Sequence, residues 1–277
     1  MNTSRIVYTS KETKGPGILS KKAPKIAGVS VLFILLVSSL FYLARLPNWQ
    51  VANFSFSGLK TLDQNMLQKK VMKILEGNYA LIIPKRSFFF VNSDKLSKAV
   101  LNDFPNIQSV SVTKKFPDSV KIAVEERELW GIFCAKAVKK DVAAQCVYVD
   151  KTGFAYEQAP DSAGFLITRI NTEGFSPEVP SQILEPPLTE RMLFLAEELR
   201  KNLGLEVIGY ELSKKVPREI WVVTSEGFKI YFNKDDDWVN AFRVLKTVLD
   251  EEIKDKRPQL DYIDLRFGNK VFYKLLP

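Results

Sequence analysis

The longest feature of the hydropathy pattern is an uninterrupted apolar segment near the N-terminus. Residues 26–44 contain no Asp, Glu, Lys or Arg. As a helix that rises about 1.5 Å per residue, the segment is roughly 28 Å long, close to the hydrocarbon thickness of a bilayer. A helix without a polar face would otherwise have to lie inside a large protein. The pattern therefore predicts one transmembrane helix, which we place at residues 26–46.

A cleaved signal peptide is the alternative for this segment, because it also joins a basic start to an apolar core. The apolar run is longer than the usual 7 to 15 or so residues, and residues 41–45 lack a small-x-small cleavage pattern. The tail before it holds six Lys or Arg and one acid, whereas the twenty residues after Arg45 hold only Lys60 and Asp63. By the positive-inside rule, we expect residues 1–25 to form a cytoplasmic tail and the bulk of the chain to be extracytoplasmic.

The spacing of apolar residues after the anchor predicts a mixed module over residues 47–127. Alternation of apolar and polar residues indicates strands, and helical spacing indicates helices. The predicted elements are a strand at 52–57, helices at 62–74 and 93–104, and strands at 109–113 and 120–125. Thr61 is a candidate N-cap for the first helix. The order is β-α-α-β-β, with an unusual run, Ser87-Phe88-Phe89-Phe90, in the long connection between the helices.

Residues 128–277 are expected to form a second domain, rich in strands and containing two amphipathic helices. Strands are predicted at 130–133, 147–150, 206–212, 219–224 and 228–233. One helix is predicted at 188–203, ending near Gly204, and the other at 235–253. The fold class is therefore α+β, with the four segments 1–25, 26–46, 47–127 and 128–277.

The net charge of +8 at first suggests a nucleic-acid-binding protein. The tail accounts for six cations minus one acid, or +5, which leaves +3 for residues 26–277. A basic tail beside a membrane helix fits anionic inner-leaflet lipids and control of topology. We therefore expect a membrane protein that does not bind nucleic acid.

The composition offers little for catalysis or for holding a metal or cofactor. The chain has no His and two Cys, which removes the common general base and a four-ligand structural zinc site. We interpret the acids at 235–237 as helix caps and those at 125–128 as a solvated strand edge. Ser111-Val112-Thr113-Lys114 and Lys151-Thr152-Gly153 spell two motifs of penicillin-binding enzymes, but the first lies in a predicted strand, where Ser111 and Lys114 point to opposite sides. We predict a non-enzymatic protein with no metal and no cofactor.

Several segments, in this order along one single-pass chain, resemble the FtsQ/DivIB family of bacterial division proteins, whose extracytoplasmic part begins with a POTRA module. They are residues 105–112 and 116–127 in the paired strands, 148–154 in a Tyr-x-Asp hairpin, and 262–267 in the terminal strand. The resemblance implies a scaffold in the cell inner membrane at the division septum. It also implies that the scaffold binds extracytoplasmic parts of FtsB/FtsL-type coiled-coil proteins and helps to recruit or regulate the septal peptidoglycan synthase. The alternative is a POTRA-containing envelope assembly or secretion component, against which the two late helices argue, because such proteins need a run of barrel strands.

Two further predictions concern the second domain. Cys134 and Cys146 are expected to form a disulfide outside the cytoplasm, and two unpaired buried thiols are the alternative. The terminal hairpin, with a turn at Gly268-Asn269 and a last strand over 270–275, is expected to bind the partner by strand addition. The predicted contact residues are Arg266, Phe267, Val271, Phe272 and Tyr273.

In that hairpin, Ile263, Leu265 and Phe267 are expected to share one face of their strand, with Asp264 and Arg266 on the other. A bare edge strand beside apolar residues is an aggregation hazard that a partner strand would cover. The alternative is that Arg266 pairs with an acid on a neighbouring strand and that the apolar residues belong to the core.

Overall fold

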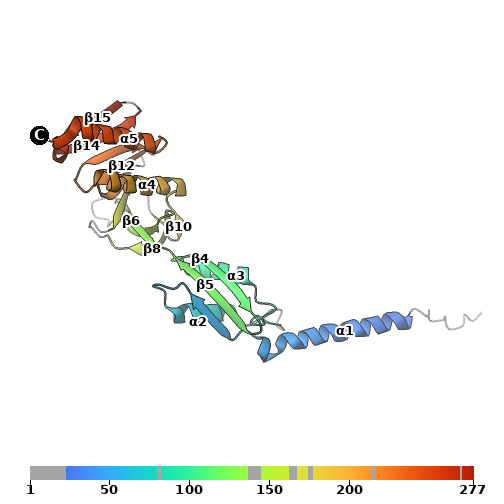
Figure 1. Ribbon diagram of the computed structural model, residues 1–277. Helices are drawn as coiled ribbons and strands as arrows, with labels where there is room; N and C mark the ends of the chain where they lie inside the picture. Colours follow the sequence, from blue (N-terminus) through green and yellow to red (C-terminus); the bar gives the residue numbers. More distant parts are fainter. Residues whose placement is uncertain are drawn as a thin grey trace, which may run out of the picture. The chain divides into compact units, whose positions relative to one another are not determined.

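The computed structural model describes residues 23–79, 83–136, 145–161, 167–173, 177–213, 216–268 and 270–277. Its first element is the long helix α1 (Ala23–Arg45), as predicted (Figure 1). Within it, Gly28–Arg45 is long and apolar enough to cross a membrane, and only 6% of that window is buried. A core helix of a soluble domain would be mostly buried, so the exposed apolar side chains fit a lipid-facing helix. Most of the predicted cytoplasmic tail lies outside the described residues.

The chain folds as two compact units. One comprises the chain up to residue 55 with residues 68–96 and 112–121, and the other comprises residues 56–67, 97–111 and 122–277. The domain boundaries expected at residues 46 and 127 stay predictions, because these compact units divide the chain at other positions.

The predicted β-α-α-β-β order is present between the anchor and residue 127. It consists of β1 (Asn53–Ser57), α2 (Gln64–Ile74), α3 (Ser93–Asp103), β4 (Ile107–Lys115) and β5 (Ser119–Glu126). The three strands form a sheet in the order β1-β5-β4. The long connection contains a short hairpin that was not predicted, β2 (Asn78–Tyr79) and β3 (Ile83–Pro84), and a 3-10 turn, η1 (Pro47–Trp49), follows the anchor.

The predicted N-cap at Thr61 is wrong. Helix α2 begins at Gln64, and the Asp63 carboxylate accepts the Asn65 N–H at 2.8 Å, which is the contact of a capping side chain. The Thr61 hydroxyl instead donates to the carboxylate of Glu126. Thr61 lies three residues before the first helical residue, so the capping position falls to Asp63.

The second unit contains a ten-stranded sheet in the order β10-β8-β7-β6-β9-β11-β12-β13-β14-β15. Its strands are β6 (Leu129–Lys136), β7 (Gln145–Asp150), β8 (Phe154–Ala159), β9 (Thr168–Glu173), β10 (Ser181–Gln182), β11 (Val207–Leu212), β12 (Glu219–Thr224), β13 (Lys229–Asn233), β14 (Leu260–Phe267) and β15 (Lys270–Leu275). Strand β9 was not predicted, although it lies between β6 and β11 and pairs in parallel with both.

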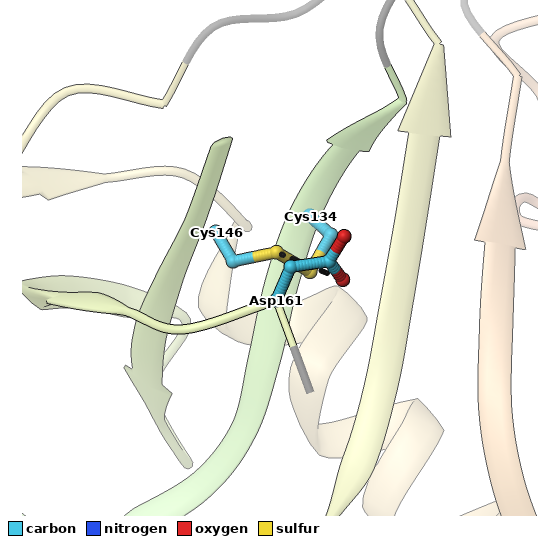
Figure 2. Close-up of side chains that lie close together, drawn as sticks. All are labelled: Cys134, Cys146 and Asp161. Carbon is cyan, nitrogen blue, oxygen red and sulfur yellow. Dashed lines mark hydrogen bonds between the residues drawn. A yellow bond between two sulfur atoms is a disulfide. The ribbon is translucent and has the colours of Figure 1, made fainter. Parts of the chain in front are cut away.

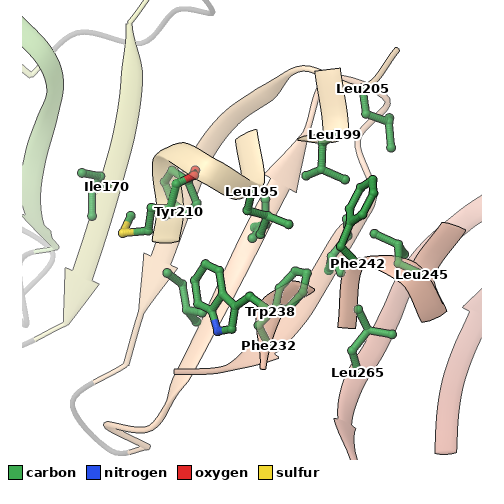
Figure 3. Packing of buried hydrophobic residues seen from close by; sticks show 14 of the residues in the cluster. Ile170, Leu195, Leu199, Leu205, Tyr210, Phe232, Trp238, Phe242, Leu245 and Leu265 are labelled. Atoms are coloured by element: carbon green, nitrogen blue, oxygen red, sulfur yellow. The ribbon is translucent and has the colours of Figure 1, made fainter. Parts of the chain in front are cut away.

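Helices α4 (Pro186–Leu203) and α5 (Trp238–Thr247) pack on this sheet through one hydrophobic core. Figure 3 shows Leu195 and Leu199 of α4 and Phe242 of α5 among side chains from the strands. Helix α4 ends at Gly204, which has left-handed φ of 63°, as predicted. Helix α5 is shorter than predicted, because Asp237 caps its start and residues 248–259 continue as the π-helical turn η2 (Val248–Ile253) and the 3-10 turn η3 (Lys254–Gln259).

Candidate partner-binding hairpin and polar clusters

The terminal hairpin ends the ten-stranded sheet. Among the strands that the structure describes, β15 pairs with β14 alone, so one side of its backbone has no neighbouring strand. Gly268 has φ of 65°, in the left-handed region that favours glycine in tight turns. Asn269, the other residue of the predicted turn, lies outside the described residues. The predicted partner site is therefore at a sheet edge.

A β-bulge changes the side-chain pattern near the tip of this hairpin. Asp264 lies opposite Phe272, and Phe267 lies opposite Lys270. Between these pairs β14 advances by three residues and β15 by two, so β14 contains one extra residue. The prediction that Phe267 shares a face with Ile263 is wrong, because the extra residue turns Phe267 to the opposite face.

The bulge brings two aromatic side chains together on the sheet face opposite the helices. The rings of Phe267 and Phe272 meet edge to face with centroids 5.3 Å apart, and the two residues are 55% and 51% exposed. On the other face, Tyr273 is exposed, whereas Val271 packs partly against the core. Three of the five predicted contact residues thus have free apolar surface beside the edge strand.

Arg266 is held by acids of the same sheet. Its guanidinium donates to both carboxylate oxygens of Asp264, at 2.8 and 2.5 Å, and forms an ion pair with Glu219 of β12. It also lies over the ring of Tyr231, 5.2 Å from the centroid. The hydrogen bonds that Arg266 donates to Asp264, together with the negative charges of Asp264 and Glu219, raise the pKa of Arg266 and outweigh the effect of burial. The alternative for Arg266 was an ion pair with an acid on a neighbouring strand. The acids that it meets are Asp264 on its own strand and Glu219 on β12, which lies beyond β13, and contact with a partner stays a prediction.

An aromatic row that was not predicted crosses three strands of the sheet beneath Arg266. The rings of Trp221 and Tyr231 are 5.1 Å apart, and those of Tyr231 and Tyr262 are stacked 5.2 Å apart. The sequence contained a signal for this row, because each aromatic residue alternates along its strand with buried residues such as Ile230 and Ile263 and so lies on the opposite face of the sheet. Arg266, which lies over the middle ring of the row, helps to line a shallow hollow of about 310 Å³ with Glu219 and Phe267.

The interpretation of residues 125–128 as a solvated edge is wrong for Glu126, although Glu125 and Glu128 are exposed. Its side chain is buried, and its carboxylate accepts backbone N–H groups of Lys60 at 2.7 Å, Thr61 at 3.0 Å and Leu62 at 3.1 Å. Burial raises the pKa of Glu126, but the hydrogen bonds from the Thr61 hydroxyl and these three amides outweigh it and lower the pKa to about 2. Glu126 therefore stays ionised at neutral pH and organises a loop.

A second carboxylate, Asp150, organises the hairpin turn that follows it. It pairs with Arg127 at 2.5 Å and accepts the Thr152 N–H at 2.8 Å. Burial raises its pKa, while hydrogen bonds from Thr152 and Arg127 lower it further than burial raises it. Lys151-Thr152-Gly153 is thus the predicted turn, and Ser111 and Lys114 lie in strand β4 rather than on the helix that a serine nucleophile would need.

Cys134 and Cys146 lie directly opposite each other in the β6–β7 pair and are joined by a disulfide (Figure 2). Their Cα atoms are 4.2 Å apart. Asp161 approaches the bond, with a carboxylate oxygen 3.9 Å from Cys146 Sγ. These three residues have metal-ligand side chains, but sulfurs that are bonded to each other cannot supply thiolate ligands.

Comparison with known proteins finds one matching family model and two similar division proteins. The family model "POTRA domain, FtsQ-type" matches residues 50–127, the region that holds the β-α-α-β-β elements. Two curated relatives, both called "Cell division protein DivIB", come from Clostridium botulinum strains Loch Maree and Hall. Each is 26% identical to this chain, over 264 and 270 residues, and each match covers 92% of this chain and 94% of the relative.

Proposed function

We propose that this chain, which belongs to the FtsQ/DivIB family, is a single-pass, non-enzymatic scaffold of the bacterial division machinery. The two DivIB relatives and the FtsQ-type POTRA domain support a role associated with cell division. Helix α1 supports attachment to a membrane by one apolar segment. By the positive-inside rule, the basic tail supports an N-terminus in the cytoplasm and folded units outside it. The division proteins among the relatives support a location at the division septum of the inner membrane.

The edge strand β15 is the observation that carries the proposed mechanism. An unpaired edge has main-chain donors and acceptors that can bind one further strand, and adjacent side chains then give specificity. Here Phe272 and Tyr273 lie on opposite faces of that edge, and both are exposed. We infer that an extracytoplasmic segment of an FtsB/FtsL-type coiled-coil protein adds to β15, and that the complex helps to recruit or regulate the septal peptidoglycan synthase.

Phe272 and Tyr273, the exposed aromatic residues of the edge strand itself, offer a cleaner test than Arg266 or Val271. Arg266 is tied into internal ion pairs and Val271 packs on the core, so their substitution would also disturb the fold. Phe272→Ala and Tyr273→Ala remove surface that is already exposed. Phe194→Ala, which removes a 39% exposed ring from helix α4, is the matched control.

The assay is capture of purified FtsB/FtsL-type partners by the full chain in detergent. Interface aromatics commonly contribute more than about 1 kcal/mol each, so either hairpin variant should weaken binding by at least about fivefold, and the double variant by more. Phe194→Ala should bind like wild type, and all variants should keep the wild-type melting transition. Wild-type capture by the folded double variant would refute the proposed site. In a parallel assay that offers purified outer-membrane barrel proteins, capture of those proteins in place of the FtsB/FtsL-type partners would favour the assembly or secretion alternative.

A further inference from the structure

Just beyond the anchor, the first compact unit gathers aromatic rings that the proposed function does not use. Trp49 lies 5.3 Å from Phe89 and 6.3 Å from Phe116, measured between ring centroids. Phe88 contacts the same two phenylalanines, at 5.9 and 5.6 Å. We call these four residues, together with Phe90, the aromatic patch.

Much of the aromatic patch faces solvent. Phe116 is 65% exposed, Phe89 is 53% exposed and Phe90 is 42% exposed. Single exposed apolar residues are common on protein surfaces, but a contiguous group of aromatic rings marks an interaction surface. The run of phenylalanines at 88–90 has no explanation in the core, because two of its three rings are exposed.

Covalent distance places the aromatic patch close to a bilayer that α1 would cross. Helix α1 ends at Arg45, and Trp49 follows four residues later, a reach of at most about 14 Å even for an extended chain. The headgroup region of one leaflet is itself about 5–8 Å thick. Trp49 is therefore near the interface whichever way the chain is oriented.

Backbone hydrogen bonds carry the phenylalanines to the same place. The Phe88 N–H donates to the Trp49 carbonyl at 2.8 Å, and the Val51 N–H donates to the Arg86 carbonyl at 2.8 Å. Gln50 and Ser87 form a β-bridge between these bonds. The segment after β3 is thus held against the residues that leave the anchor.

The charges nearest the aromatic patch are mostly basic, and an acid close by, Asp118, accepts hydrogen bonds from Asn53 and Ser119. Residues 83–91 and 112–117 contain Lys85, Arg86, Lys114 and Lys115 and no acid. The Lys114 ammonium donates to the carbonyls of Phe88 and Val91, both at 3.1 Å, and Lys115 is exposed. Exposed aromatic rings beside cations suit the boundary between acyl chains and anionic headgroups.

We propose that the aromatic patch docks into the interface of the membrane that α1 crosses, with its cations against anionic phospholipid headgroups. Trp49 and the exposed phenylalanines enter the headgroup boundary on the side where α1 ends. The contact fixes the first compact unit against the bilayer instead of leaving it to turn freely on the anchor. This inference needs α1 to span the membrane, but it does not need the partner proposed for β15.

Photocrosslinking of the full chain in lipid nanodiscs tests the proposal. Photoreactive benzoylphenylalanine replaces Phe89, Phe116 or, as the control, Phe194, one position at a time. The discs contain phosphatidylglycerol mixed with phosphatidylcholine, and mass spectrometry measures lipid adducts. Positions 89 and 116 should give at least fivefold more lipid adduct than position 194, which lies on an exposed face of α4. Equal adducts at all three positions, or chain-to-chain adducts in place of lipid at 89 and 116, would overturn the proposal.

The charge component has its own variant. Lys115→Glu should lower the lipid adduct at position 89 in phosphatidylglycerol discs and change it little in discs of phosphatidylcholine alone. Thr113→Glu adds a negative charge at another exposed position of the same strand and keeps both lysines. It should lower the lipid adduct at position 89 less than Lys115→Glu does. No effect of Lys115→Glu on a variant with an unchanged melting transition would refute the role of anionic lipid.

Discussion

Glu126 makes a stability prediction that can be worked from the structure. Its ordinary pKa of 4.5 falls to about 2 in the folded chain, a difference of about 2.5 units. At about 1.36 kcal/mol per unit, the ionised carboxylate contributes about 3 kcal/mol to folding at pH 7. Glu126→Gln is a neutral isostere of the protonated acid, so it should lower the free energy of unfolding by about that amount.

The pH dependence gives the prediction a definite sign. Because the folded pKa lies below the unfolded value, the contribution is fully present above about pH 5 and is lost as the pH falls toward 2. The difference in unfolding free energy between wild type and Glu126→Gln should therefore shrink from about 3 kcal/mol at pH 7 to about 1.5 kcal/mol at pH 3.

Urea unfolding of the full chain in detergent, followed by near-ultraviolet circular dichroism, measures this difference. Hydrogen exchange adds a local reading, because the amides of residues 60–62 should lose protection in the variant. Glu125→Gln is the control, since Glu125 is exposed and accepts one bond from Ser109. A cost below about 1 kcal/mol at pH 7, or a difference that does not change between pH 7 and pH 3, would refute the reasoning.

Two further outcomes are expected. Alkylation of the unfolded but unreduced protein should leave Cys134 and Cys146 unlabelled, and full labelling of both thiols would show that the bridge is absent. Reduction should lower the free energy of unfolding by about 3 kcal/mol, because the bridge closes a loop between residues 12 apart. Protease added outside the inner membrane should digest the chain beyond residue 46 and spare the tail, whereas protection of the folded units would reverse the topology.

Local patterns determined the elements that have strong periodicity. The charge-free run fixed α1, alternation fixed strands such as β5 and β12, and helical spacing fixed α4. Strand β9 was missed because its sequence, TRINTE, has little apolar character, although Ile170 is completely buried. Its parallel pairing with β6 and β11 depends on strands distant in sequence, which no local pattern contains.

For the candidate partner site, too, the sequence predicted some features and tertiary structure decided the others. The sequence alone placed exposed apolar residues on a terminal strand, and Phe272 and Tyr273 are indeed exposed there. The bulge that turns Phe267 over, the ion pair from Arg266 to Glu219 and the loop held by Glu126 were decided by tertiary structure.

The physical reason is that hydropathy reports whether a side chain prefers burial and says nothing about which partner it meets. A carboxylate such as Glu126 reads as solvated until three backbone N–H groups from residues 60–62 are brought to it. In the same way, Phe88 and Phe89 are only an apolar run until folding sets them beside Trp49. The sequence by itself determined the anchor, the order of the elements and the apolar character of the edge, and the tertiary structure decided which charges and rings came together.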